Sequence, residues 1–241
     1  MNSVITDTTS DHKLELIGEF FLKLATNPLV TQELPEVEQY AEKYRVSREG
    51  NDADETEIAF LDLYCALHRV GNAYSTDERL KLDQKKGYFN HPGGISPIEK
   101  AENFIHNDSI VADLGAGNGL QGLLLQYLYP HKETRLIELS EEMIRIGKIY
   151  QEILDFDDNR IKWVHDDIIN VSLSEIDFLY LYRPSRPIKD GLHLYHAISK
   201  KITDNKKQLT IFSIADCLKD FLDSSYSIFY SDGHLTCFEK T

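Results

Sequence analysis

A cluster of glycines preceded by an acidic residue is the first feature with the spacing of a binding site. Residues 111–119 read VADLGAGNG and include a short apolar run that leads into the glycines. Glycines permit positive φ angles and let a ligand approach the bare backbone, and a helix that begins directly after them leaves amide N–H groups for an anionic group. Asp113 precedes the turn, where a carboxylate would repel a pyrophosphate but could bind an ammonium or sulfonium group. We therefore expect a cofactor site at this turn.

A second acidic residue, Glu138, ends the next apolar run of the sequence. A carboxylate about 20 residues after such a glycine turn accepts hydrogen bonds from ribose hydroxyls, which several nucleotide cofactors share. The glycine spacing is Gly-x-Gly-x-Gly, and the third glycine of the dinucleotide fingerprint would fall at Leu120. The spacing thus argues against a nicotinamide cofactor, which remains the alternative interpretation of this turn.

Alternating strand and helix patterns surround these residues and must position them. Apolar runs predict strands at 110–114, 134–138, 161–165, 176–182 and 209–214, and helical spacing predicts helices at 96–105, 120–129, 141–154, 192–202 and 215–222. Ser96 and Glu99 have the spacing of a capping box. The runs 226–230 and 234–238 flank a Ser-Asp-Gly turn and predict a terminal hairpin. The pattern indicates an α/β fold, with a mostly parallel Rossmann-like sheet and helices on both faces.

The segment before this pattern has helical apolar spacing, with a polar loop around residues 49–55 and a further helix expected over residues 74–82. Leu14, Ile17 and Phe21 follow one helical face, and Phe60 and Leu67 belong to another. We therefore expect an α-helical extension over residues 1–90 and a cofactor-binding domain over residues 91–241.

The DLGAGNG turn and the strand-end Glu138 resemble those of class I S-adenosylmethionine-dependent methyltransferases. The resemblance covers about residues 95–241 and implies a seven-stranded sheet ending in an antiparallel hairpin, S-adenosylmethionine as cofactor, and methyl transfer. It implies that Asp113 lies near the methionine amino group, that Glu138 binds the ribose hydroxyls and that Leu139 packs on the adenine. The cofactor contacts that it implies around the turn are Asp113, Gly115, Ala116, Gly117, Glu138 and Leu139.

Two adjacent acids, Asp166 and Asp167, follow the third predicted strand. In the family this strand usually ends in an acid near the adenine amino group, a role that the resemblance gives to Asp167, with Asp166 as the alternative. The competing interpretation is that the pair caps the next turn. Together with His165 the acids could form a metal site, but no further ligand has suitable spacing, and we expect no metal.

The segment after the fourth predicted strand reads YRPSRP from Tyr182. In the family this segment faces the transferred methyl group, so Tyr182 and Arg183 are the candidate catalytic residues. Tyr182 could position or deprotonate a nucleophile, and Arg183 or Arg186 could hold an anionic group of the substrate. The alternative is a proline-locked loop whose arginines pair with surface acids.

An aromatic segment precedes the domain and reads KGYFNHPGG from Lys86. Its composition suits a lid better than a helix or strand. It loosely resembles a segment that closes over the cofactor in several methyltransferases, so Tyr88 and Phe89 are candidate cofactor contacts. The alternative is that these aromatic residues pack the helical extension onto the sheet.

Composition and net charge limit the kinds of partner that we expect for this chain. The chain has 241 residues, 41% of them hydrophobic, with a formal net charge of −14. It contains no run as long as a membrane span, and its polar first residues lack a secretory core, so we expect a cytoplasmic protein. A negative field repels phosphate backbones, which argues against nucleic acid and for a small-molecule or protein acceptor. The N-terminal helices would form a side wall for the acceptor or mediate homodimerisation.

Taken together, these features predict a methyltransferase that acts by direct in-line displacement. The alternatives are an NAD-dependent oxidoreductase of Rossmann type and a non-catalytic protein that binds S-adenosylmethionine.

Overall fold

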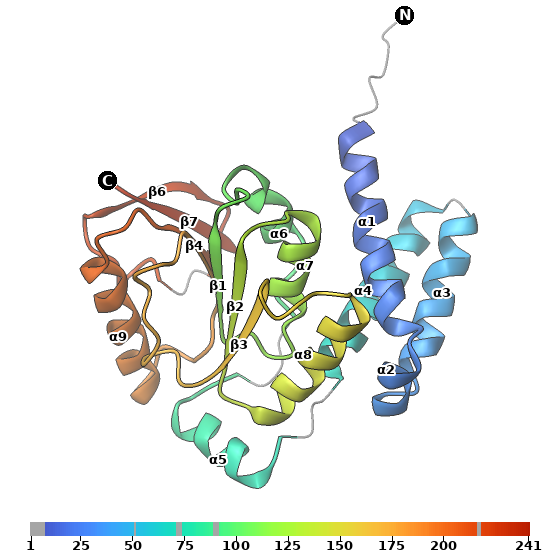
Figure 1. The fold of residues 1–241 in the computed structure, drawn as a ribbon, viewed down its shortest axis with the longest axis horizontal. Helices are drawn as coiled ribbons and strands as arrows, with labels where there is room; N and C mark the ends of the chain where they lie inside the picture. The colour runs from blue at the N-terminus through green and yellow to red at the C-terminus, as the bar shows by residue number, and fades with distance from the viewer. Residues whose placement is uncertain (1–7, 51, 71–73, 89–91, 216–217) are drawn as a thin grey trace, which may run out of the picture. The chain divides into compact units, whose positions relative to one another are not determined.

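The computed structural model describes residues 8–50, 52–70, 74–88, 92–215 and 218–241. The chain forms two compact units, Met1–Val70 and Gly71–Thr241, each with its own core (Figure 1). This division follows packing alone, and the domain boundary expected after residue 90 stays a prediction.

The first unit is helical, as the apolar spacing predicts. Its described helices are α1 (Thr8–Ala25), α2 (Pro28–Glu33), α3 (Val37–Gly50) and α4 (Ala53–Arg69). Phe20, Phe21 and Leu24 of α1 are buried with Leu63 and Leu67 of α4, on the faces that the i, i+3, i+4 spacing marks. Aromatic edge contacts add to this core, because the ring centroids of Phe21 and Phe60 lie 5.4 Å apart.

The second unit contains a seven-stranded sheet in the order β3-β2-β1-β4-β5-β7-β6. Strands β1 to β5 are parallel, while β7 runs antiparallel to both β5 and β6. The chain reverses its direction of strand addition between β1 and β4, which is where ligands bind in open sheets of this kind. The strands are β1 (Ile110–Leu114), β2 (Glu133–Glu138), β3 (Ile161–His165), β4 (Phe178–Tyr182), β5 (Thr210–Ile214), β6 (Tyr226–Ser231) and β7 (Leu235–Lys240).

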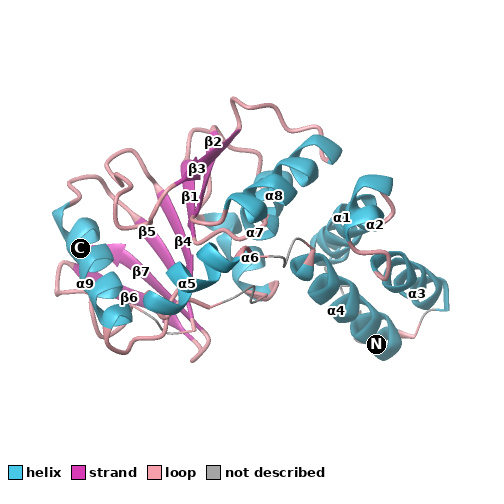
Figure 2. Ribbon diagram, turned by 90° about the horizontal axis from the view of Figure 1, so that it is seen from below, coloured by secondary structure: helices cyan, strands magenta, loops and turns pink. Residues whose placement is uncertain are grey.

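Helices cover both faces of this sheet, which confirms the predicted Rossmann-like α/β architecture (Figure 2). On one face, α7 (Leu120–Leu128) contacts β1 and β2, and α8 (Glu141–Ile153) contacts β2 and β3. On the other face, α9 (Asp190–Asp204) adds its apolar side to the core formed by the central strands. The remaining helical segments of this unit are α5 (Thr76–Gln84), α6 (Ser96–Lys100) and the 3₁₀ turn η1 (Ala101–Asn103).

Two local predictions about helices are wrong. The capping box expected at Ser96 does not form, because α6 begins at Ser96 itself after a helical Ile95, and no side chain caps it. A capping box forms instead at Ser75 and Glu78, ahead of α5. No helix forms over the described part of 215–222. There the chain makes turns, and the Leu218 amide donates to the Ser213 hydroxyl at 3.2 Å.

None of the helices in the described part of the chain is long and apolar enough to cross a membrane.

Candidate active site

The glycine turn lies at the carboxyl end of β1 and is held in a left-handed backbone conformation. Gly115, Gly117 and Gly119 have φ angles of 79°, 56° and 77°, which other residues adopt only at a cost. The amides of Gly115 and Ala116 both donate to the carbonyl of Ile137 at 2.9 Å. These hydrogen bonds hold the turn against the end of β2.

Glu138 is fixed against this turn at the carboxyl end of β2. Its Oε2 accepts from the amide of Gly117, and its Oε1 accepts from the amides of Leu139 and Ser140, all at 2.8 Å. Burial raises the pKa of this carboxyl, and the three amides oppose that rise. A carboxylate offers about four acceptor positions, so Oε2 keeps one for a further donor. Leu139, the next residue, is half-buried.

Asp113 is buried at the end of β1, with 3% of its surface exposed. Burial raises its pKa to about 7; a hydrogen bond with the Gly122 amide opposes this rise, and the negative charge of Glu138 adds to it. Its Oδ2 has no hydrogen-bond partner among the described residues. A buried carboxylate oxygen without a donor is costly, and a cationic donor would offset that cost.

The two acids after β3 form turn contacts. Asp166 Oδ1 accepts from the amide of Asp167 at 2.7 Å and from the side-chain amide of Asn170 at 2.8 Å. Asp167 Oδ1 accepts from the amide of Ile169 at 3.3 Å, and its Oδ2 is paired with Lys85. These contacts are those of the turn-capping interpretation, and an adenine contact by either acid stays a prediction. No group of three or more His, Cys, Asp or Glu in the described residues could hold a metal ion.

A strap formed by residues 74–88 runs along the carboxyl ends of β2, β3 and β4, and it contains the helix expected over residues 74–82 as α5 (Figure 1). Glu78 accepts from the hydroxyl of Ser140 at 2.6 Å, directly after β2. Lys85 pairs with Asp167 after β3, and its carbonyl accepts from the Ser185 hydroxyl after β4 at 2.6 Å. Apolar spacing predicted the helix of the strap, but these contacts with the strand ends had no signal in the sequence.

Tyr88 ends the described part of this strap and meets the loop after β4. Its amide donates to the carbonyl of Pro184 at 3.2 Å, and Gly87 forms a β-bridge with Ser185. The structure thus brings Tyr88 to the segment that carries Tyr182 and Arg183. Phe89, the other predicted lid contact, lies outside the described residues.

Tyr182 closes β4 as a half-buried side chain. Burial raises the pKa of its phenol and the charge of Arg183 opposes that rise, so the group stays protonated at neutral pH. A protonated phenol positions an acceptor by hydrogen bonding rather than by removing its proton. Its ring lies 6.3 Å from that of His234, a neighbour that sequence reasoning missed because His234 comes from the terminal hairpin.

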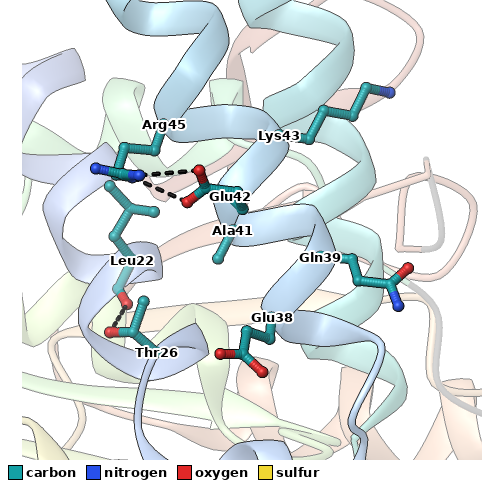
Figure 3. A pocket seen from close by; sticks show the side chains of 8 residues that line it. All are labelled: Leu22, Thr26, Glu38, Gln39, Ala41, Glu42, Lys43 and Arg45. Carbon is teal, nitrogen blue, oxygen red and sulfur yellow. Dashed lines mark hydrogen bonds and ion pairs between the residues drawn. The ribbon is translucent and has the colours of Figure 1, made fainter.

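The N-terminal unit has an open groove of about 690 Å³ between α1 and α3 (Figure 3). The charged groups that line it are surface residues, and Arg45 and Glu42 already form an ion pair with each other. The groove therefore offers no chemistry comparable to that of the strand ends in the second unit.

Comparisons with known proteins bear on the fold. No family model matches the chain, and no curated protein matches its sequence. Solved structures do match: the "putative RNA methyltransferase PH1948" from Pyrococcus horikoshii shares 15% identity over 66% of this chain and 89% of that chain, with a TM-score of 0.51. TrmN from Thermus thermophilus (16%, 61% of this chain, TM-score 0.49) and an rRNA methylase from Streptococcus thermophilus (15%, 60% of this chain and 94% of that chain, TM-score 0.45) also match. This chain spans 48% of the length of the TrmN chain.

The Pyrococcus horikoshii structure contradicts the expectation that nucleic acid is not a partner, because a protein with a similar fold is described there as a "putative RNA methyltransferase". Net charge misled the prediction because it sums the whole chain, whereas phosphates contact local basic side chains. The sheet order, the terminal hairpin and the match to the Pyrococcus horikoshii structure agree with one another. The chain has the fold of the class I S-adenosylmethionine-dependent methyltransferases.

Proposed function

We propose that the chain binds S-adenosylmethionine at the carboxyl ends of β1 and β2 and transfers its methyl group by direct in-line displacement. The observation that carries this proposal is the fixed geometry of the turn, in which three left-handed glycines meet the carboxylate of Glu138. When bound, the cofactor supplies an electrophilic methyl group on a sulfonium ion.

The environments of Glu138 and Asp113 support the roles that we propose for them. Glu138 has an acceptor position on Oε2 for a ribose hydroxyl. Asp113 has a buried Oδ2 that an ammonium group would satisfy. We assign Gly115, Ala116 and Gly117 to close backbone contact. The further cofactor contacts that we propose are Leu139, Asp166, Asp167, Tyr88 and Phe89.

Tyr182 and Arg183 are the residues that we propose nearest to the transferred methyl group. In-line displacement depends on alignment of the acceptor with the sulfonium, because the methyl group is already activated. Tyr182, as a protonated phenol, would donate or accept one hydrogen bond that orients the acceptor atom. For the acceptor we propose a small molecule or a protein side chain. RNA is a second candidate, because a structure with a similar fold is described as a "putative RNA methyltransferase".

Calorimetric titration of the full chain with S-adenosylhomocysteine and, separately, with NADH tests the cofactor. We expect binding of the first and none of the second. Glu138→Gln should weaken binding at least about tenfold. A neutral amide forms weaker hydrogen bonds with the ribose hydroxyls than a charged carboxylate does. Glu141→Gln, an exposed carboxylate at the start of α8, is the matched control and should bind normally. Binding of NADH in place of S-adenosylhomocysteine would favour the oxidoreductase.

Incorporation of labelled methyl groups tests catalysis. The chain is incubated with methyl-labelled S-adenosylmethionine and with separated small-molecule, protein and RNA fractions of a cell extract. Label in one fraction identifies the acceptor class. Binding of S-adenosylhomocysteine with label in none of the three fractions would favour a non-catalytic cofactor-binding protein.

A further inference from the structure

Two arginines in the loop after β4 have no acidic partner among the described residues. Arg183 and Arg186 form no ion pair there, although the chain contains 40 Asp and Glu residues against 26 Lys and Arg residues. The buried Nε of Arg183 also has no hydrogen-bond partner in the described part of the chain. The structure therefore does not support the interpretation in which these arginines pair with surface acids.

Both guanidinium groups lie near one aromatic ring. The Cζ atoms of Arg183 and Arg186 are 5.9 Å and 5.6 Å from the centroid of the Tyr88 ring, within the range of cation–π contact. Two cations that share one ring repel each other, and an anion between or beside them would relieve that repulsion. The pair is thus a local positive site in a chain of net charge −14.

The loop that carries the pair is held in place before any ligand binds. The Ser185 hydroxyl donates to the carbonyl of Lys85, and the buried Tyr195 hydroxyl donates to the carbonyl of Ser185. Pro184 and Pro187 restrict the backbone on either side. Arg183 itself has a φ of 21°, a conformation that persists only where its surroundings impose it. A fixed loop lowers the entropic cost of binding.

The pair lies next to the glycine turn. Pro184 Cβ is 3.3 Å from the position that a Cβ on Gly115 would occupy, so the loop packs on the turn assigned to the cofactor. Tyr182, which precedes Arg183, is the residue assigned to orient the acceptor atom. An anion held by the two arginines would therefore belong to the acceptor and would lie beside the reacting group.

We propose that Arg183 and Arg186 form a subsite for a compact anionic group, a phosphate or a carboxylate, carried by the methyl acceptor. The inference rests on the proposed function for the identity of the neighbouring cofactor. Guanidinium groups bind both oxyanions through paired N–H donors, which fixes orientation as well as affinity. The acceptor would thus be selected by its charge and aligned by the same contact.

Calorimetric titration with phenyl phosphate and with benzoate tests this subsite, at fixed ionic strength and with S-adenosylhomocysteine present. Benzyl alcohol serves as the neutral probe. We expect at least one anion to bind the unmodified chain, benzyl alcohol not to bind, and the double variant Arg183→Gln/Arg186→Gln to lose at least about tenfold in anion affinity. The comparison between the two anions shows which oxyanion the subsite prefers.

Arg160→Gln is the matched control. Arg160 is an exposed arginine without an ion pair in the described residues, and it lies at the amino end of β3, the opposite edge of the sheet. This variant should bind the anions as the unmodified chain does. Arg186→Gln alone, at an exposed position, repeats the test should the double variant fold poorly.

The outcomes separate the two proposals. Equal anion affinity in the unmodified chain and in both Arg186 variants, or no binding of either anion, would overturn the subsite. Failure of S-adenosylhomocysteine to bind would overturn the proposed function instead, and the anion titrations repeated without it would still decide the subsite.

Discussion

Replacing Asp113 with Asn is expected to stabilise the second unit by an amount that grows with pH. The pKa of Asp113 rises from 3.8 to about 7 because burial disfavours its charged form. Between these two values the folded chain keeps the proton and the unfolded chain has lost it, so unfolding releases a proton. The contribution of Asp113 to the free energy of unfolding therefore falls as pH rises from about 4 to 7 and stays constant above 7.

The size of the effect follows from the shift. A shift of about 3 units at about 1.4 kcal/mol per unit amounts to about 4 kcal/mol. The Asn variant has no such titration, so its advantage in the free energy of unfolding should grow by about 1.4 kcal/mol per pH unit up to pH 7. Between pH 5 and pH 7 the difference should change by about 3 kcal/mol.

Urea unfolding followed by tryptophan fluorescence measures this difference. Trp163 is the single tryptophan of the chain and lies on β3, so it reports the second unit alone. Asp220→Asn, at an exposed position, removes the same charge and should show no comparable trend. A difference between the Asp113 variant and the unmodified chain that stays constant from pH 5 to pH 8 would refute the argument from burial.

Two further predictions concern the same turn. If the ammonium group of the cofactor contacts Asp113, the affinity for S-adenosylhomocysteine should fall about tenfold for each pH unit below about 7. Binding at those pH values requires loss of the Asp113 proton. Calorimetry should show this fall in the unmodified chain and not in Asp113→Asn. Gly119→Ala should destabilise the unit by more than about 2 kcal/mol and perturb the emission of Trp163, because a left-handed alanine is strained and its Cβ would lie 2.5 Å from the indole ring. Gly233→Ala has the same strain without a neighbour within 4 Å and should cost only about 1–2 kcal/mol; equal costs for the two variants would contradict the predicted clash.

The sequence by itself determined the architecture and the centre of the candidate site. Apolar periodicity is a local property, so it predicted the alternation of strands and helices, the helical first segment and the terminal hairpin that the structure contains. The turn at Gly115, Gly117 and Gly119 was also predictable from local sequence, because a left-handed turn favours residues without a Cβ. Glu138 was found from its position at the end of a strand, and its bond to Gly117 agrees with that placement.

Tertiary structure alone decided what these residues meet. The burial of Asp113 depends on α7 packing over β1, and no local pattern gives the pKa that follows. The strap from α5 reaches Ser140 across 62 positions and Ser185 across 100, contacts that periodicity cannot encode. The sequence also could not show whether the arginines of the β4 loop form ion pairs. An ion pair depends on distances between segments that lie far apart in the chain. The capping box at Ser96 failed for a related reason: the chain enters α6 through a helical Ile95, and that backbone conformation leaves no side-chain cap.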